Sequence, residues 1–323
     1  MFKAINEVEF GEIDVADPGP GEVQVRTLAS LISTGTERWI LRNEFTWYPT
    51  PYPVVPGYQR AGIVVKVGEG VDGIRAGERV MATRSVWQGD IRPFNGAHAA
   101  LANTKAEELF KLPESVKDAD AAGLVVAQVG YNAASRIAMK PGDWVVVYGD
   151  GLIGQCGLQA AKARGARTIL VGRRGERLAA AEGFADHIVN SRSENVTEAV
   201  LGITGGKPVT AVIDTLQTEE VQATYMPLME KGEGQVVYSG FTPGKVWADM
   251  AQLQQKEFTA HFVSGWNRSR MEATLRLMAE GKMSIERLIT HRGPAREGPK
   301  FYAMASENKE PFLGILLEWG AEP

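Results

Sequence analysis

The chain has 323 residues, with 35 Lys and Arg against 39 Asp and Glu and a formal net charge of −4. This length is sufficient for two domains, each with its own hydrophobic core. The balanced charge, without a basic block, argues against a nucleic-acid partner and against binding to a membrane surface. No apolar run approaches the ~20 residues that span a bilayer, and residues 1–9 lack the apolar core of a signal peptide. We therefore expect a cytoplasmic protein.

The first third of the chain has short β-prone runs, separated by Gly and Pro, at residues 23–27, 62–67 and 78–82. Such spacing predicts a compact β-rich domain. Residues 120–139 have a helical pattern with Asp120 as the N-cap, and the Lys-Pro-Gly-Asp segment 140–143 ends it.

From residue 143 onward strands and helices alternate, which is typical of a doubly wound parallel sheet and places the chain in the α/β class. The predicted strands are 144–148, 168–171, 187–189, 211–213, 235–239 and 259–263. The predicted helices are 153–164, 174–182, 196–201, 219–230 and 268–280.

The strongest motif lies where the first of these strands meets the first helix. It is a Gly-x-Gly-x-x-Gly pattern of Gly149, Gly151 and Gly154, with Leu152 and Ile153 opening the helix. In this context the pattern predicts a dinucleotide-binding (Rossmann) turn, because the glycines allow a tight turn and a close approach of the pyrophosphate to the helix N-terminus.

The end of the second strand carries Gly172, Arg173 and Arg174. An NAD site usually has an acidic residue here for the ribose 2′-OH, whereas arginine pairs with a 2′-phosphate. The segment favours NADP(H) over NAD(H) as the cofactor. The alternative is that both arginines belong to a solvated loop.

The predicted domains are a β-rich domain of residues 1–119 and 283–323 and a nucleotide-binding domain of residues 120–282. We expect the tail, with a closing strand at 312–319, to return to the first domain and the active site to lie in the cleft between the two.

Several segments resemble the medium-chain dehydrogenase/reductase (MDR) superfamily. They are 56–64 (PGYQRAGIV), 76–80 (AGERV), 140–143 (KPGD), the glycine fingerprint and 289–292 (ITHR). The resemblance implies a GroES-like β-rich catalytic domain and a Rossmann domain. Segments 32–37, 52–58 and 315–319 are similar to the bacteriochlorophyllide hydroxyethyl dehydrogenase branch.

The chain departs from the zinc-dependent members at their metal ligands. It has Thr34, Thr36 and Glu37 where they carry Cys-x-Ser/Thr-Asp, and Tyr58 and Gln59 where they carry Gly-His-Glu. Hydroxyl, phenol and amide groups are poor ligands for Zn²⁺. The single cysteine, Cys156, excludes a four-cysteine zinc lobe and is expected to be a buried apolar residue. We therefore expect no zinc.

Three residues are candidates for the chemistry. Thr36 matches the family hydroxyl that passes a proton between substrate and cofactor ribose, or it only satisfies a turn. Tyr58 is the candidate proton donor if a cation such as Arg38 lowers its pKa, or it fills the space left by the metal. Glu37 is expected to pair with an arginine and hold the loop.

The remaining candidates follow from position in the resemblance. Ser239, Gly240, Ser264 and Gly265 follow strands of the nucleotide-binding domain and match segments that line the nicotinamide. The candidates for the substrate pocket are Thr34, Gln59, Trp47, Trp87, His98 and Trp266. The aromatic loop 45–53 is suited to a large or ring-containing substrate, or to an interface between subunits.

Three functions remain open. The first is a zinc-independent NADP(H)-linked dehydrogenase acting on a secondary alcohol or ketone, and the second is an enoyl or quinone reductase. The third is a nucleotide-binding sensor without catalysis. The family resemblance implies a homodimer or homotetramer.

Overall fold

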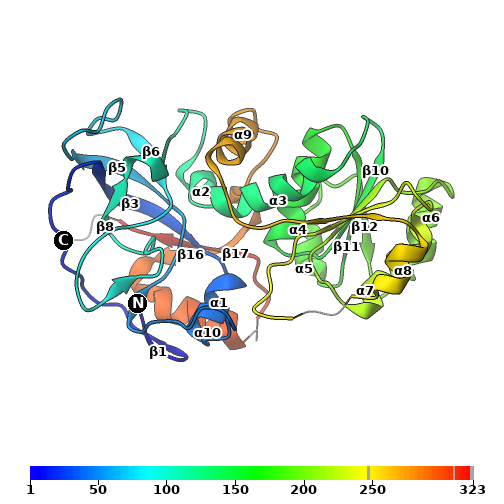
Figure 1. Ribbon diagram of the computed structural model, residues 1–323, viewed down its shortest axis with the longest axis horizontal. Coiled ribbons are helices and arrows are strands. Elements are labelled where there is room, and N and C mark those ends of the chain that lie inside the picture. Colours follow the sequence, from blue (N-terminus) through cyan, green and yellow to red (C-terminus); the bar gives the residue numbers. More distant parts are fainter. Residues whose placement is uncertain (246–247, 308–309, 321–323) are drawn as a thin grey trace. The chain divides into compact units, whose positions relative to one another are not determined.

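The computed structural model describes residues 1–245, 248–307 and 310–320. The chain divides into two compact units, unit 1 (Met1–Val125 and Leu288–Pro323) and unit 2 (Val126–Arg287). These boundaries fall a few residues after those predicted at 119/120 and 282/283. In Figure 1 unit 1 contains the blue and cyan N-terminal strands together with the red C-terminal strand, and unit 2 is mostly green to yellow.

Unit 1 is rich in β-structure. Its strands are β1 (Phe2–Ala4), β2 (Glu7–Val8), β3 (Glu22–Ile32), β4 (Val54–Val55), β5 (Arg60–Val67), β6 (Arg79–Ala82), β7 (Arg92–Pro93), β8 (Leu101–Lys105), β9 (Leu109–Lys111), β16 (Ile289–Pro294) and β17 (Gly314–Glu318). Its helices are α1 (Thr36–Leu41), α2 (Asp118–Ala121) and α10 (Gly298–Glu307), with short 3-10 turns at η1 (Ala106–Glu108) and η4 (Ala295–Glu297).

The long strand β3 organises the larger sheet of unit 1. It pairs in antiparallel fashion with β5, β8 and β17. The register aligns Ile315 with Ile32 and Glu318 with Ala29, so the last strand of the chain lies beside the segment that leads into α1. An apolar cluster that includes Ile32, Ile40 and Tyr302 packs beneath it.

Unit 2 is a parallel sheet with the strand order β12-β11-β10-β13-β14-β15. These strands are β10 (Trp144–Tyr148), β11 (Arg167–Gly172), β12 (His187–Asn190), β13 (Ala211–Asp214), β14 (Gln235–Tyr238) and β15 (Thr259–Phe262). The helices are α3 (Leu124–Arg136), α4 (Leu152–Ala163), α5 (Gly175–Ala179), α6 (Val196–Thr204), α7 (Glu219–Tyr225), α8 (Met250–Gln255) and α9 (Arg268–Ala279), with 3-10 turns at η2 (Met226–Leu228) and η3 (Glu286–Leu288).

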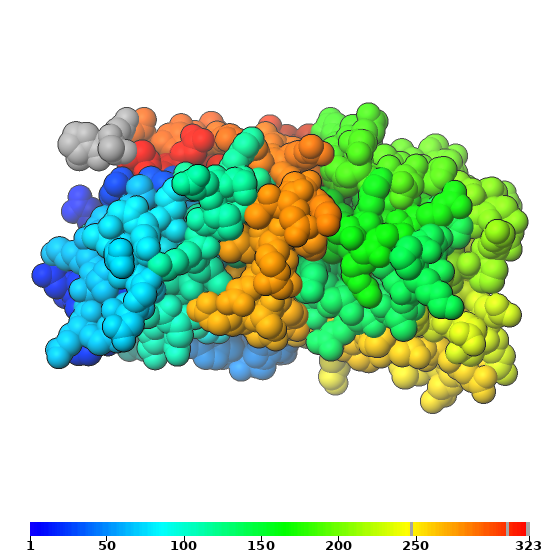
Figure 2. All heavy atoms as spheres, turned by 90° about the horizontal axis from the view of Figure 1, so that it is seen from above, coloured from blue at the N-terminus to red at the C-terminus, as the bar shows by residue number. Residues whose placement is uncertain are grey.

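The inner strands of this sheet are almost continuous apolar runs because helices cover both faces of a doubly wound sheet. All residues of β10, β13 and β14 are buried. In Figure 2 the orange segment that includes α9 lies at the surface, and α9 buries Met271, Leu275 and Met278 on its inner side. All six predicted strands are present, so the α/β class with a Rossmann parallel sheet is confirmed.

Three predictions of local structure were wrong. Residues 120–139 form two helices instead of one, and Asp120 lies inside α2, whose cap position is Lys117. The helix predicted at 174–182 is only the short α5, and α8 was not predicted. Across the described ranges, no helix is both long and apolar enough to cross a bilayer.

Candidate active site

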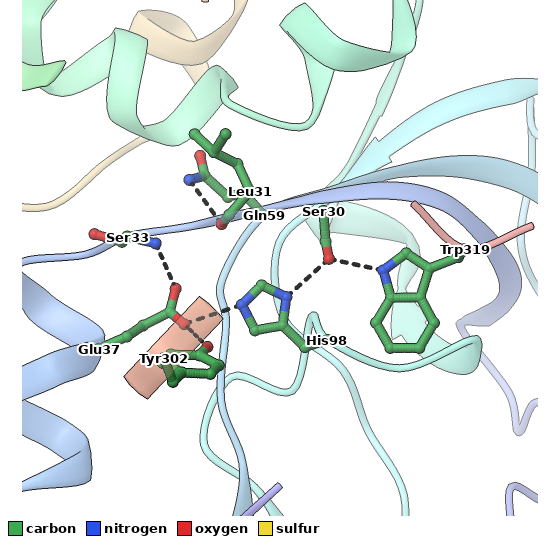
Figure 3. A network of polar contacts seen from close by, with 8 residues as sticks. All are labelled: Ser30, Leu31, Ser33, Glu37, Gln59, His98, Tyr302 and Trp319. Carbon is green, nitrogen blue, oxygen red and sulfur yellow. Dashed lines mark hydrogen bonds and ion pairs between the residues drawn. The ribbon is translucent and has the colours of Figure 1, made fainter. Parts of the chain in front are cut away.

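The carboxylate of Glu37 is the centre of a buried polar network in unit 1 (Figure 3). Glu37 lies in the first turn of α1 and is fully buried. Its Oε1 accepts the backbone N–H of Ser33 at 2.8 Å, and its Oε2 accepts the hydroxyl of Tyr302 from α10. The Nε2 atom of His98 lies 3.0 Å from the same Oε2. Three donors therefore satisfy a carboxylate that has been removed from water.

The other side of the His98 ring leads to Trp319. The ring Nδ1 lies 2.8 Å from Ser30 Oγ, which also accepts the indole N–H of Trp319 at 2.8 Å. When Ser30 donates its hydroxyl hydrogen to Nδ1, every group in the chain of contacts has a partner. In this arrangement the Nε2 atom of His98 carries a hydrogen and donates it to the Glu37 carboxylate.

Backbone pairing and one glycine place the His98 ring. The N–H groups of Ala97 and His98 donate to the carbonyls of Gly57 and Pro56 at 2.9 and 3.1 Å. A Cβ atom on Gly57 would meet the His98 ring at 2.6 Å, and Gly57 has φ +90°. Only glycine therefore lets the ring lie against this turn, directly before Tyr58.

Tyr58 lies beside this network and is partly buried. Its phenol is hydrogen-bonded to the side chains of Ser33 and Thr36. Burial raises the pKa of Tyr58 above its ordinary value, the hydrogen bond with Ser33 lowers it, and the charge of Glu37 raises it further. The expectation that a cation such as Arg38 lowers this pKa was wrong, because burial is the dominant cause and the charge that acts on the phenol is that of the Glu37 carboxylate.

One further expectation in unit 1 needs correction. Glu37 bonds to His98, Tyr302 and a backbone N–H in place of an arginine. His98, a candidate for the substrate pocket, has a buried side chain with both ring nitrogens hydrogen-bonded. Its place in the network makes it a support for Glu37.

The positions that hold zinc in the resembling enzymes carry weak metal ligands here. Gln59 is fully buried and its amide lies 3.4 Å from the carbonyl of Leu31, whereas Thr34 is partly exposed. Among the described residues, no group of three or more His, Cys, Asp or Glu side chains could hold a metal ion. Cys156 is buried in α4. The donor set does not fit Zn²⁺.

In unit 1 the structure brings together several side chains of the predicted aromatic wall. Tyr48 packs against Phe94 with ring centroids 5.5 Å apart, and Trp47 packs on Phe45 at 5.1 Å. Trp47 and Tyr48 remain more than half exposed. Trp87 lies against Gly96, whose added Cβ would meet its ring at 2.6 Å. Trp266 belongs to unit 2.

In unit 2 the glycine fingerprint has the geometry of a phosphate-binding turn. Gly149 has φ +114°, and a Cβ on Gly154 would meet the carbonyl oxygen of Gly149 at 2.0 Å. Gly151 is the N-cap of the twelve-residue helix α4 and offers no side-chain cap, and a Cβ there would meet nothing within 4 Å. Helix and strand thus pack closely while the helix N-terminus stays open, which fits a pyrophosphate.

The turn after β11 is basic, as predicted, and an acid from the fingerprint loop is hydrogen-bonded to it. Arg173 is exposed and Arg174 is partly buried. The Oδ2 atom of Asp150 accepts the backbone N–H groups of Arg173 and Arg174, each at 2.9 Å. Arg177, one turn into α5, has its Nη1 atom 3.7 Å from Asp150 Oδ1. Burial first, and then the charge of Arg174, lower the pKa of Arg177 to about 10.

The carboxyl ends of β13 and β14 adjoin the fingerprint. Thr215 Oγ1 donates to the carbonyl of Tyr148 at 2.8 Å, and an added Cβ on Gly149 would meet it at 2.0 Å. The amide of Gln217 donates to the carbonyl of Gly240 at 2.9 Å. Ser239 is buried, whereas Ser264 and Gly265 are exposed after β15. Ser239 and Gly240 therefore lie at the ligand-binding edge of this sheet.

Sequence reasoning missed Tyr302, Ser30 and Trp319. Tyr302 reaches Glu37 from helix α10, and Trp319 reaches Ser30 next to the pairing of β17 with β3. It also missed Asp150 and Arg177. Arg177 had a signal, because it lies three residues after Arg174 on a predicted helix and so faces the same way. No sequence pattern pointed to Asp150, because an acidic residue between two glycines does not indicate which group it contacts in the fold.

Comparison with known proteins places this geometry in a family. The model of the alcohol dehydrogenase GroES-like domain matches residues 19–114, and the model of the zinc-binding dehydrogenase matches residues 153–280. The chain belongs to the medium-chain dehydrogenase/reductase superfamily. It is thus one of the alcohol-dehydrogenase-like oxidoreductases, with unit 1 as the GroES-like domain and unit 2 as the Rossmann domain.

Its relatives act on different substrates. The chain is 29% identical over 309 residues to L-threonine 3-dehydrogenase of Pyrococcus horikoshii, covering 88% of this chain and 87% of the relative. It is 27% identical over 316 residues to 2-desacetyl-2-hydroxyethyl bacteriochlorophyllide A dehydrogenase of Cereibacter sphaeroides, covering 96% and 94%.

Solved structures share the fold. The chain resembles 2R,3R-butanediol dehydrogenase from Bacillus subtilis with a TM-score of 0.84 at 22% identity, covering 98% of this chain and 97% of that one. It resembles Escherichia coli quinone oxidoreductase complexed with NADPH with a TM-score of 0.78 at 24% identity, covering 95% and 94%.

Proposed function

We propose that this chain is an NADP(H)-dependent oxidoreductase that interconverts a secondary alcohol and a ketone without zinc. The observation that carries the proposal is the hydroxyl cluster of Ser33, Thr36 and Tyr58 at the positions around the metal site of the resembling enzymes. It supplies hydrogen-bond donors for a carbonyl oxygen where those enzymes supply a Lewis acid.

The choice of NADP(H) rests on the charges around β11. Gly172 leaves no acid at the end of the strand, and Arg173, Arg174 and Arg177 follow it. The charge of Arg174 is close enough to lower the pKa of Arg177, so two guanidinium groups share one region. Such a concentration of positive charge favours a phosphate on the ribose over a bare hydroxyl.

The residues of unit 1 divide the chemistry among them. When bound, the cofactor supplies a hydride to the carbonyl carbon or takes one from the alcohol. The Tyr58 hydroxyl, protonated at neutral pH, donates a hydrogen bond to the carbonyl oxygen as negative charge develops there. The alkoxide then takes the phenol proton, and Thr36 and Ser33, bonded to the phenol, pass a replacement proton to it.

A single assay tests this proposal. Oxidation of NADPH is followed at the nicotinamide absorbance band, with EDTA present, against matched ketones and α,β-unsaturated carbonyls. Turnover of ketones in EDTA supports the proposal, and loss of that turnover in EDTA with recovery on added Zn²⁺ contradicts it. Tight NADPH binding without any turnover would indicate a sensor.

An enoyl or quinone reductase is the second candidate, and the raised pKa of Tyr58 favours it. A phenol that holds its proton still polarises the carbonyl of an enone, and in that reaction the hydride goes to the conjugated carbon. Turnover of enones alone in the same panel would indicate an enoyl or quinone reductase. The aromatic side chains of loop 45–53 suit a ring-containing substrate of either class.

We also propose a homo-oligomer that is cytoplasmic. The strand β15 is the edge of the six-stranded sheet, and its Phe262 is 77% exposed while stacking on Tyr238. An unpaired edge with an exposed ring suits pairing with a second copy. Phe262→Glu should then lower the mass in sedimentation; an unchanged mass contradicts this interface. The chain has a single cysteine and so cannot form an intrachain disulfide, which suits a reducing compartment.

A further inference from the structure

The carboxylate of Asp150 fills the space that a side chain on Gly172 would occupy. A Cβ on Gly172 would meet Asp150 Cβ at 2.6 Å and Asp150 Oδ2 at 2.8 Å. Asp150 comes from the fingerprint loop after β10, whereas Gly172 ends β11. The carboxylate beside the end of β11 therefore comes from the fingerprint loop and not from β11 itself.

The Asp150 carboxylate forms its contacts within the protein. Its Oδ2 accepts the N–H groups of Arg173 and Arg174, each at 2.9 Å, and its Oδ1 faces Arg177 at 3.7 Å. The Asp150 side chain is only 8% exposed. Bonds from two backbone amides to a carboxylate are charge-assisted and hold the backbone of the turn in one conformation.

A second residue, Gln155, also holds the basic turn by hydrogen bonds. The amide of Gln155, in the first turns of α4, donates to the carbonyl of Asp150 at 3.1 Å and to the carbonyl of Arg177 at 2.7 Å. The fingerprint loop, α4 and the basic turn are thus joined through the side chains of Asp150 and Gln155. The amides of Arg173 and Arg174 are occupied, so a 2′-phosphate has to be recognised by the guanidinium groups.

We infer that Asp150 is a positioning residue for cofactor choice, holding the 172–174 turn so that Arg174 and Arg177 face the ribose 2′-phosphate. The inference rests on the proposed preference for NADP(H). Asp150 binds the turn and leaves the glycine backbone at Gly151 and Gly154 untouched. Its removal therefore affects recognition of the 2′-phosphate more than recognition of the pyrophosphate.

The test is titration of the full chain with NADPH and with NADH, followed by nicotinamide fluorescence. Asp150→Ala should raise the Kd for NADPH about tenfold and the Kd for NADH less than about threefold. Asp150→Asn keeps an oxygen acceptor and removes the charge, so it should retain the wild-type ratio or increase it. Gly172→Ala displaces the carboxylate by steric contact and should reproduce the loss seen in Asp150→Ala.

A matched control lies at the opposite end of β11. Asp186 accepts the N–H and the hydroxyl of Thr168 at 2.8 and 2.9 Å, in the same way that Asp150 serves the other end. Asp186→Ala should lower the Tm and leave the ratio of the two Kd values unchanged.

The outcomes separate the two proposals. Equal Kd values for NADPH and NADH in the wild-type chain would overturn the cofactor preference and the inference with it. A wild-type preference that persists in Asp150→Ala, or an equal loss in Asp150→Asn, would overturn the inference alone. A parallel rise of both Kd values in Asp150→Ala would also overturn it, because the residue would then serve only the loop.

Discussion

The Nε2 atom of His98 lies 3.0 Å from the Oε2 atom of Glu37, and both side chains are buried. With a hydrogen on this ring nitrogen, His98 donates to the Glu37 carboxylate and supports it. Burial raises the pKa of Tyr58 beside this network, and the charge of Glu37 raises it further.

Replacing Glu37 should destabilise unit 1. In Glu37→Gln one acceptor oxygen becomes an NH₂ group that faces donors, which should cost about 1–3 kcal/mol of unfolding free energy. Tyr302→Phe removes one donor and leaves two, so its loss should be smaller. Denaturant unfolding of the three proteins measures the difference, and equal stability of Glu37→Gln and wild type would contradict the network.

Tyr58→Phe keeps the ring and removes the hydroxyl. If this hydroxyl stabilises the developing alkoxide, kcat should fall about 10²-fold or more with the Kd for cofactor unchanged. Tyr131→Phe on α3 is the matched control and should retain kcat. A near-wild-type kcat in Tyr58→Phe would leave the residue as a packing element.

The arginines of the basic turn should differ in their effect on the two cofactors. Arg174→Ala and Arg177→Ala should each weaken NADPH binding about tenfold, the equivalent of ~1.4 kcal/mol, and leave NADH binding within about twofold. Arg167→Ala is the control, because Arg167 stacks on Trp144 at the start of β11. The same loss for both cofactors would argue against a 2′-phosphate contact.

Asp214 gives the chain a pH-dependent stability. Burial raises its pKa above 3.8, and the backbone bonds from Gln217 and Leu216 lower it in part. Because the pKa of Asp214 is higher in the folded state, its protonated carboxyl contributes stability that is fully present below pH 3.8. This contribution is lost as pH rises through the folded-state pKa. Asp214→Asn keeps the Oδ1 acceptor and should be more stable than wild type at pH 7. This difference in the free energy of unfolding should shrink as the pH falls toward 4.

Thermal unfolding of both proteins across this range checks the sign. A gap that widens on acidification would mean that the carboxylate is favoured in the folded state. Asp214→Ala, which also removes the acceptor for Leu216 and Gln217 at 2.8 Å each, should lose stability at every pH.

The sequence was sufficient to predict the sheet of unit 2. Its strands are local apolar runs such as 144–148, and the glycines of the fingerprint are required by conformation and close packing at Gly149 and Gly154. Thr36 and Tyr58 were also found from local motifs, and the structure joins them by a hydrogen bond.

The partners of Glu37 could not be predicted in this way. Tyr302 lies 265 residues away, and Ser30 meets Trp319 across 289 residues. These contacts depend on strand register and helix packing, which local periodicity does not contain. The sign of the Tyr58 pKa shift was missed for the same reason, since it is set by burial and by the fully buried Glu37.

The insertion of unit 2 between the two parts of unit 1 determines the order in which the chain can be completed. Residues 126–287 are contiguous, so the Rossmann sheet has all its strands before β17 leaves the ribosome. The sheet around β3 lacks β17 until then, and Glu37 lacks Tyr302. During synthesis the GroES-like half is therefore the last to be completed, because Ala29–Ile32 of β3 lack their partner strand until β17 has emerged.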